Sequence, residues 1–178
     1  MESLICGLKI SSCYMKVILV TGTPGTGKTS LARELSLFTL YTYLDPVKKF
    51  GSDFRVGYDT ERKCHIVDHK RLTLAVLGYL QAQKKGKKGV IVDSHLAHFL
   101  PASRVDACIV TVCSLKALKR RLSKRSYSPS KIRENMDAEI FDTCLLEARA
   151  LGHKVIVVNT TGKSKPSLAR SVAKILGL

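Results

Sequence analysis

Several features are absent from the sequence, and each absence excludes a class of protein. No apolar run approaches the roughly 18 to 20 residues that cross a bilayer, so we expect no membrane span. The six cysteines form no C-x-x-C pair, which argues against a zinc ribbon or a redox motif. No secretory signal or internal repeat is evident. The 178 residues therefore predict one domain with free thiols in a reducing compartment, the cytoplasm or, in a eukaryote, also the nucleus.

Acidic residues are also scarce. Fourteen Asp and Glu stand against thirty Lys and Arg, which gives a formal net charge of +16. A phosphate-binding enzyme needs several cations at its site, but not this surplus. The excess is typical of contact with nucleic acid or another polyanion, and it is equally typical of a solvated surface that keeps a protein soluble. Composition leaves both interpretations open.

The most informative stretch that is present is GTPGTGKTS, residues 22–30, which fits the pattern G-x-x-x-x-G-K-[ST]. A buried strand over residues 16–21 precedes it and a helix from Lys28 follows, which is the context that such a phosphate loop requires. Its glycines let the backbone wrap a phosphate, Lys28 carries a charge to the β and γ phosphates, and the Thr29 hydroxyl can ligate Mg²⁺. The expected triphosphate-binding residues are Gly22, Gly25, Thr26, Gly27, Lys28, Thr29 and Ser30.

Strands and helices alternate along the rest of the chain. Apolar runs with no polar alternation predict further buried strands over residues 41–44, 89–93, 107–113 and 154–158, and amphipathic patterns predict helices over 28–36, 68–85, 114–122, 131–151 and 167–176. This order predicts an α/β fold, a three-layer sandwich around a parallel sheet. We expect residues 1–14 to be a dispensable extension and residues 15–178 to form the domain.

Two segments interrupt this alternation, residues 45–67 and 124–131. Both would lie at the carboxyl ends of strands, where ligands bind in open α/β sheets. The first segment carries several cations that could hold the phosphate of an acceptor opposite the phosphate loop. The sequence does not select among them: Lys48, Lys49, Arg55, Arg62 and Lys63.

The strand over residues 89–93 ends in an acid, within GVIVDSH. Asp93 at this strand tip could hold Mg²⁺ directly or through water. His95 could meet the water shell of the metal or the γ phosphate, or it could be a capping or packing residue. We expect His98 to be structural.

A basic segment, KRRLSKRSYSPSK, follows the helix over residues 114–122. Arg121 and Arg125 are four residues apart and share a helix face. Arginines on a mobile segment can close over phosphates and neutralise charge during transfer, so both are catalytic candidates. The alternative is a solvated basic helix end, which is what we expect of Lys119, Arg120 and Lys124.

Taken together, the motifs resemble the adenylate kinase isoenzyme 6 family and its small archaeal relatives. The resemblance covers nearly everything from Lys16 onward. It rests on GTPGTGKTS, GYDTERKCHIVD, VDSHLAHFLP, RLSKRSYSPSKI, NMDAEIF and TTGKS. It implies the P-loop fold of nucleoside monophosphate kinases and a Mg²⁺-dependent transfer of phosphate from ATP to AMP or a related monophosphate.

The resemblance also assigns roles to particular residues. It gives Asp93 and His95 a Walker-B-like role and places Arg125 in a short lid over about residues 124–134. Residues of about 45–67 become the monophosphate-binding insertion. Lys49 stands where many relatives have arginine, which makes it the acceptor-site candidate, and Ser126 stands where relatives often have glycine.

The family resemblance implies partners as well as substrates: a small-subunit ribosomal protein and ribosomal RNA, in late maturation of that subunit. We expect a monomer in which Lys28, Arg125 and Mg²⁺ neutralise charge while Thr29 and Asp93 hold the metal. Arg121 is a second candidate for contact with the transferring group. Two other hypotheses stay open. The chain could be an assembly ATPase whose main output is remodelling, with His95 positioning a water, or a P-loop kinase for another small acceptor such as a sugar acid or shikimate.

Overall fold

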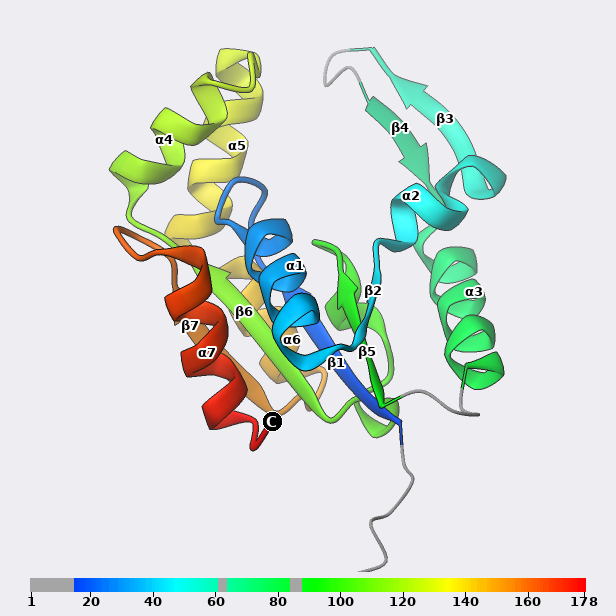
Figure 1. Ribbon diagram of the computed structural model, residues 1–178. Coiled ribbons are helices and arrows are strands. Elements are labelled where there is room, and N and C mark those ends of the chain that lie inside the picture. Colours follow the sequence, from blue (N-terminus) through cyan, green and yellow to red (C-terminus); the bar gives the residue numbers. More distant parts are fainter. Residues whose placement is uncertain (1–14, 61–63, 84–87) are drawn as a thin grey trace, which may run out of the picture.

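A five-stranded parallel sheet forms the centre of the molecule (Figure 1). The computed structural model describes residues 15–60, 64–83 and 88–178, so the predicted extension over residues 1–14 lies outside the described residues. The strand order is β2-β5-β1-β6-β7. The strands are β1 Lys16–Thr21, β2 Thr42–Leu44, β5 Gly89–Asp93, β6 Ala107–Val112 and β7 Val155–Asn159.

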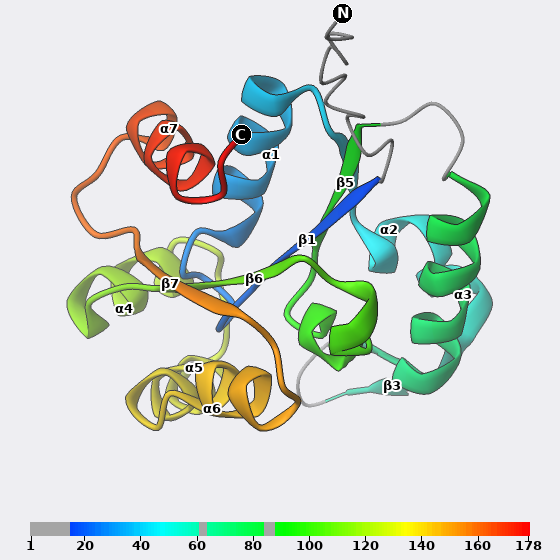
Figure 2. The same cartoon turned by 90° about the horizontal axis from the view of Figure 1, so that it is seen from below.

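Helices cover both faces of this sheet, as the sequence predicted (Figure 2). They are α1 Lys28–Thr39, α3 His69–Ala82, α4 Leu115–Ser123, α5 Pro129–Ile140, α6 Thr143–Ala150 and α7 Lys165–Ile175, with a short α2 over Pro46–Phe50 and 3₁₀ turns over Gly51–Phe54, Ala97–Phe99 and Ala102–Arg104. None of the helices among the described residues combines the length and apolar character needed to cross a membrane.

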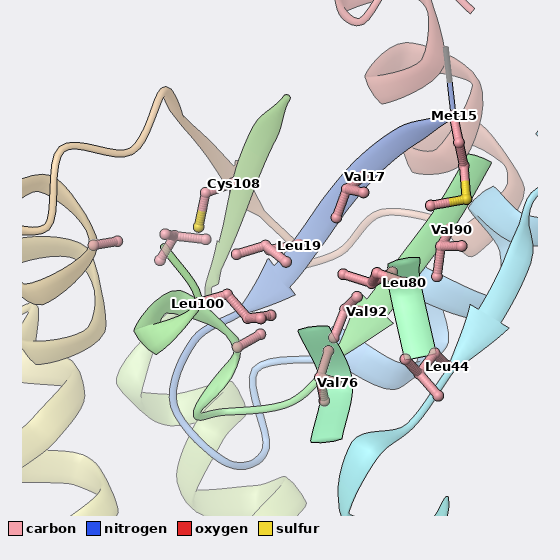
Figure 3. Close-up of a cluster of buried hydrophobic side chains, with 13 residues drawn as sticks. Met15, Val17, Leu19, Leu44, Val76, Leu80, Val90, Val92, Leu100 and Cys108 are labelled. Carbon is pink, nitrogen blue, oxygen red and sulfur yellow. The ribbon is translucent and has the colours of Figure 1, made fainter. Parts of the chain in front are cut away.

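The central strand β1 shows why the apolar runs do not alternate with polar residues. Ile18 and Val20 pack with α1 and α7 on one face of the sheet. Val17 and Leu19 pack on the opposite face, in a second cluster that includes side chains of α3 and α6 (Figure 3). Because both faces are covered, every position of such a strand must be apolar. The three-layer α/β fold is therefore confirmed.

One predicted helix is wrong. Residues 131–151 form two helices, α5 and α6, because Asp142 adopts a left-handed conformation with φ of 50°. Aspartate tolerates this conformation better than most residues. A single such residue leaves the apolar spacing unchanged, so periodicity could not reveal the break.

Residues 45–67 contain a small subdomain. Asp45 caps α2 by accepting a hydrogen bond from the backbone N–H of Lys48, and a 3₁₀ turn follows. An antiparallel hairpin, β3 Arg55–Asp59 with β4 Cys64–Val67, completes the unit. Figure 1 shows the hairpin projecting beyond the sheet, across a gap in the ribbon from α4 and α5.

Candidate active site

The phosphate loop joins β1 to α1 with a backbone that only glycine allows. Gly22, Gly25 and Gly27 have φ of 132°, 99° and 102°. A Cβ on Gly22 would lie 2.4 Å from the carbonyl oxygen of Thr111, so the loop packs tightly against β6. The loop leads directly into the first turn of α1, whose N–H groups form an anion site.

Buried hydrogen bonds hold this loop in shape. The Thr26 hydroxyl donates to the carbonyl of Thr23 at 2.8 Å and lies 2.7 Å from the Thr111 hydroxyl. The Thr26 side chain is fully buried, so it faces the protein interior, and only its backbone can meet a phosphate. Thr26 thus braces the loop.

Arg121 braces the same loop from α4. Its guanidinium donates to the carbonyls of Gly25 and Thr26 at 3.3 and 3.2 Å and to the hydroxyl of Thr160 at 3.1 Å. From the sequence, Arg121 was a candidate for contact with the transferred phosphate. In the structure its donors hold the loop to the segment that follows β7.

Lys28 sits at the start of α1 with its ammonium Nζ 3.0 Å from the carbonyl of Thr23. Burial lowers the pKa of Lys28 to about 8, and nearby Asp93 opposes that shift. The side chain is therefore a desolvated cation beside the loop, which is the state that an incoming phosphate stabilises.

Asp93 ends β5, directly beside Val20 of β1. The hydroxyl of Tyr43 donates to its Oδ2 at 2.8 Å. Burial and this hydrogen bond raise the pKa of Tyr43 to about 12, so the phenol stays a donor. Sequence reasoning missed Tyr43. The only signal was its place on β2, the strand that pairs with β5.

His95 lies beyond the tip of β5 and lines the same cavity as Lys28. The residue is exposed to solvent in the open cavity, yet desolvation by the surrounding protein, followed by the charges of Lys28 and His98, lowers the pKa of His95 to about 4. The imidazole is therefore neutral at physiological pH. A neutral ring can position a water or accept a hydrogen bond, but it adds no charge to the site.

His98 is buried behind the loop and belongs to a hydrogen-bonded chain that reaches the surface at Glu147. Its Nδ1 lies 2.9 Å from the hydroxyl of Thr21, and its Nε2 lies 2.9 Å from a carboxylate oxygen of Glu147. Burial lowers the pKa of His98, while Glu147 opposes the shift. In the neutral ring Nε2–H donates to Glu147 and Nδ1 accepts from Thr21. The chain ties α6 to the last residue before the phosphate loop.

Two cavities flank the loop. One cavity, of about 370 Å³, lies between the loop, α4 and the start of α7, and another, of about 620 Å³, faces the hairpin. They are called the donor and the acceptor cavity below, after the ligands that the family resemblance predicts for them. Arg125 lines both of them. The donor cavity is lined by Gly25, Gly27, Ser30, Leu31, Arg121, Lys124, Arg125, Thr160, Lys163, Lys165 and Leu168. The acceptor cavity is lined by Pro24, Lys28, Val47, Gly51, Arg55, His65, Val67, His95, Arg125, Tyr127, Lys131, Glu134 and Asn135.

The structure does not bring Lys49 into the acceptor cavity. Its Nζ lies 4.7 Å from the ring centre of Tyr79 and 5.7 Å from that of Phe50, in cation–π contacts. Arg55 and His65 of the hairpin line the cavity instead. The sequence included Arg55 among five candidate cations, but only the fold distinguishes it from Lys49.

The residue after Arg125 has an unusual backbone. Ser126 adopts a left-handed conformation with φ of 54°. Glycine reaches this conformation without steric cost, and serine does so at some cost. The turn that follows Arg125 is therefore a position that glycine would occupy at a lower conformational cost than serine.

Known proteins resemble this chain in sequence over most of its length. The family described as AAA domain matches residues 18–142. A Caenorhabditis elegans protein named "Adenylate kinase isoenzyme 6 homolog" is 30% identical over 162 residues, which cover 90% of this chain and 87% of that protein. A Pyrococcus furiosus protein named "Putative adenylate kinase" is 34% identical over 160 residues, covering 90% and 83%.

Solved structures support the fold. A shikimate kinase from Bacteroides thetaiotaomicron superposes with a TM-score of 0.58 over 92% of this chain and 99% of that one, at 18% identity. A sugar kinase from Janibacter gives the same score and identity. At this identity the likeness concerns the fold alone. The extended matches in sequence show that the chain belongs to the adenylate kinase isoenzyme 6 family, within the P-loop kinase fold.

Proposed function

We propose that the protein is a nucleoside monophosphate kinase, which transfers the γ phosphate of ATP to AMP or a related monophosphate. One observation carries the proposal: Arg125 lines both cavities, and Lys28 lies at the loop between them. ATP in the donor cavity would place its γ phosphate beside Lys28. A monophosphate in the acceptor cavity would approach the same point from the hairpin side.

The residues then divide the work of an in-line phosphoryl transfer. Lys28 and Arg125 neutralise the charge that shifts between the attacking and leaving oxygens. Arg55 holds the phosphate of the acceptor. No general base is needed because that phosphate is already ionised, so neutral His95 can position groups without removing a proton. Closure of the hairpin and the lid over the cavities would exclude water as a competing acceptor.

The donor set fits Mg²⁺. Thr29 presents an exposed hydroxyl in the first turn of α1, and Asp93 offers carboxylate oxygens at the tip of β5, with Tyr43 fixing Oδ2. Oxygen ligands of this kind suit Mg²⁺, which keeps several waters. When bound, the ion would neutralise part of the charge of the phosphates. Thr29 and Asp93 would hold it, Asp93 through water.

A second function is supported by the charge and the family resemblance. We infer that the protein also acts with a small-subunit ribosomal protein and ribosomal RNA, as an assembly ATPase in the maturation of that subunit. In that role His95 would position a water rather than assist an acceptor. We expect the protein to act as a cytoplasmic monomer.

A screen of acceptors tests the kinase proposal. Coupled assays would compare nucleoside monophosphates, shikimate and a sugar acid, with ATP and Mg²⁺, in the presence and absence of ribosomal subunits. Rapid ADP formation with AMP or another monophosphate is the expected result. ATP loss that needs ribosomal subunits and ignores monophosphates would favour the ATPase, and turnover only with a hydroxyl acceptor would contradict both.

A further inference from the structure

The positive charge is concentrated in two parts of the chain. Residues 107–133 hold eight Lys and Arg, residues 148–178 hold six, and neither stretch contains an Asp or Glu. The remaining 120 residues hold sixteen basic and fourteen acidic residues, so they are almost neutral. A charge that served solubility alone would not need to be placed this way.

The fold brings the two stretches together. The backbone N–H of Ser114, which caps α4, donates to the hydroxyl of Thr161 at 2.8 Å. Arg121 of α4 donates to Thr160, next along the same loop. Figures 1 and 2 both show α4 and α7 on the same side of the molecule. The outer part of this side is lined by six exposed cations, here called the basic flank: Lys116, Lys119, Arg120, Lys124, Lys163 and Lys165.

The basic and the buried residues of α4 lie on different faces of the helix. Leu118 and Leu122 are fully buried, whereas Lys116, Lys119 and Arg120 point outward at helical spacing. From residue 116 to residue 124 a helix rises about 12 Å, long enough to meet several phosphates of a nucleic acid strand. Within the described residues, no carboxylate forms an ion pair with any of these cations.

ATP accounts for only part of this surface. Lys124, Lys163 and Lys165 line the donor cavity, where a triphosphate would use them. Lys116, Lys119 and Arg120 line neither the donor nor the acceptor cavity. Their charge therefore faces solvent without a role in the transfer of phosphate.

We propose that the basic flank binds the phosphate backbone of an RNA duplex. The two basic stretches contain a single Phe, Tyr or Trp, which is Tyr127, and it lines the acceptor cavity. The flank therefore offers no aromatic ring on which an unpaired base could stack, which is how single strands are usually held. Duplex RNA is instead recognised through its phosphates and its shape. The evidence for a binding surface is the distribution of charge, and the choice of RNA as its ligand rests on the proposed ribosomal role.

Two triple variants of the full chain, with the same change of charge, test the proposal. Lys116→Gln/Lys119→Gln/Arg120→Gln removes half of the flank, and Lys70→Gln/Lys88→Gln/Arg104→Gln removes three exposed charges that lie outside both basic stretches. Binding of a labelled RNA duplex of about 16 to 20 base pairs is measured by fluorescence anisotropy across a salt series. The flank variant should bind roughly tenfold or more weakly, with a salt slope reduced by about two, because phosphate contacts are lost. The control should bind close to wild type.

Other outcomes would overturn the proposal. An equal loss of RNA affinity in both variants would mean that only net charge matters. Unchanged RNA affinity in the flank variant would show that the flank is not the binding surface. Equal affinity for a DNA duplex of the same sequence would contradict the assignment to RNA, and binding to phosphatidylserine vesicles but not RNA would indicate a membrane surface. AMP phosphorylation should stay at wild-type level in both variants. A lack of AMP phosphorylation in the wild type would contradict the kinase proposal and would leave the measurement of RNA binding unaffected.

Discussion

The two sides of the active site are built differently. On the donor side, the phosphate loop joins the largely buried strand β1 to α1 and is fixed by hydrogen bonds from Thr26 and Arg121. On the acceptor side, Arg55 and the three residues after it on β3 are exposed, and β3 and β4 form a separate two-stranded sheet in the part of the chain that the structure describes. The donor side is therefore held in shape without a ligand, whereas we expect the acceptor site to be completed when its ligand binds.

This contrast predicts different consequences of mutation on the two sides. A preorganised site stabilises the transition state at little reorganisation cost, so losses there should reduce kcat. A site that the ligand completes should lose affinity first, so losses there should raise the KM of the acceptor.

The largest effect is expected for Lys28→Met. Removing this cation should lower kcat by about 10³-fold, because no other group on the loop supplies its charge. The nucleotide-free variant should nevertheless be more stable at pH 7, by on the order of 1 to 3 kcal/mol, because burial of the ammonium is what lowers the pKa of Lys28 to about 8. Steady-state kinetics and thermal unfolding measure the two quantities. Near-normal turnover would overturn the assignment of the site.

Arg125→Gln comes next, with an expected loss of about 10²-fold in kcat and a smaller change in either KM. Its neighbour Lys124 is the matched control, since it lines the donor cavity alone. Lys124→Gln should mainly raise the KM of ATP. Equal changes of kcat and KM in the two variants would show that Arg125 has no role in phosphate transfer beyond the role of Lys124 in binding ATP.

On the acceptor side we expect Arg55→Gln to raise the KM of the monophosphate about tenfold while the KM of ATP and kcat stay within a few-fold. Lys49→Gln should change none of these, because Lys49 packs against Tyr79 and Phe50. A raised KM of the monophosphate in Lys49→Gln, with an unchanged KM in Arg55→Gln, would show that Lys49 binds the acceptor. A loss of kcat in Arg55→Gln would show that the acceptor side is as preorganised as the donor side.

The same contrast explains what the sequence could predict. The phosphate loop, the buried strands and Asp93 were identified because each rests on a local pattern whose geometry is fixed by its neighbours in the chain. The choice between Lys49 and Arg55, and the bracing role of Arg121, depend on contacts between distant segments. Tyr43 shows the limit of prediction from local patterns. Its hydroxyl donates to Asp93, which is fifty residues away in the sequence, and no pattern around Tyr43 indicates that contact.

The smallest effect is expected behind the loop, at the chain Glu147–His98–Thr21. His98→Gln and Thr21→Val should each lower the free energy of unfolding by about 1 to 2 kcal/mol at pH 7.5 and change kcat only a few-fold, since both residues are one step removed from the phosphates. The two variants should differ in their response to pH. Because burial holds the pKa of His98 below its ordinary value of 6.5, the unfolded chain binds a proton first as the pH falls.

Wild-type stability should therefore decline as the pH drops below 6.5, and Thr21→Val, which keeps the histidine, should retain this decline. His98→Gln should lose that part of it. Denaturant unfolding between pH 5.5 and 8 measures the slopes. An unchanged slope in His98→Gln would mean that this histidine is not the buried neutral group, and a large loss of kcat in Thr21→Val would mean that the donor side depends on the chain for catalysis as well as for stability.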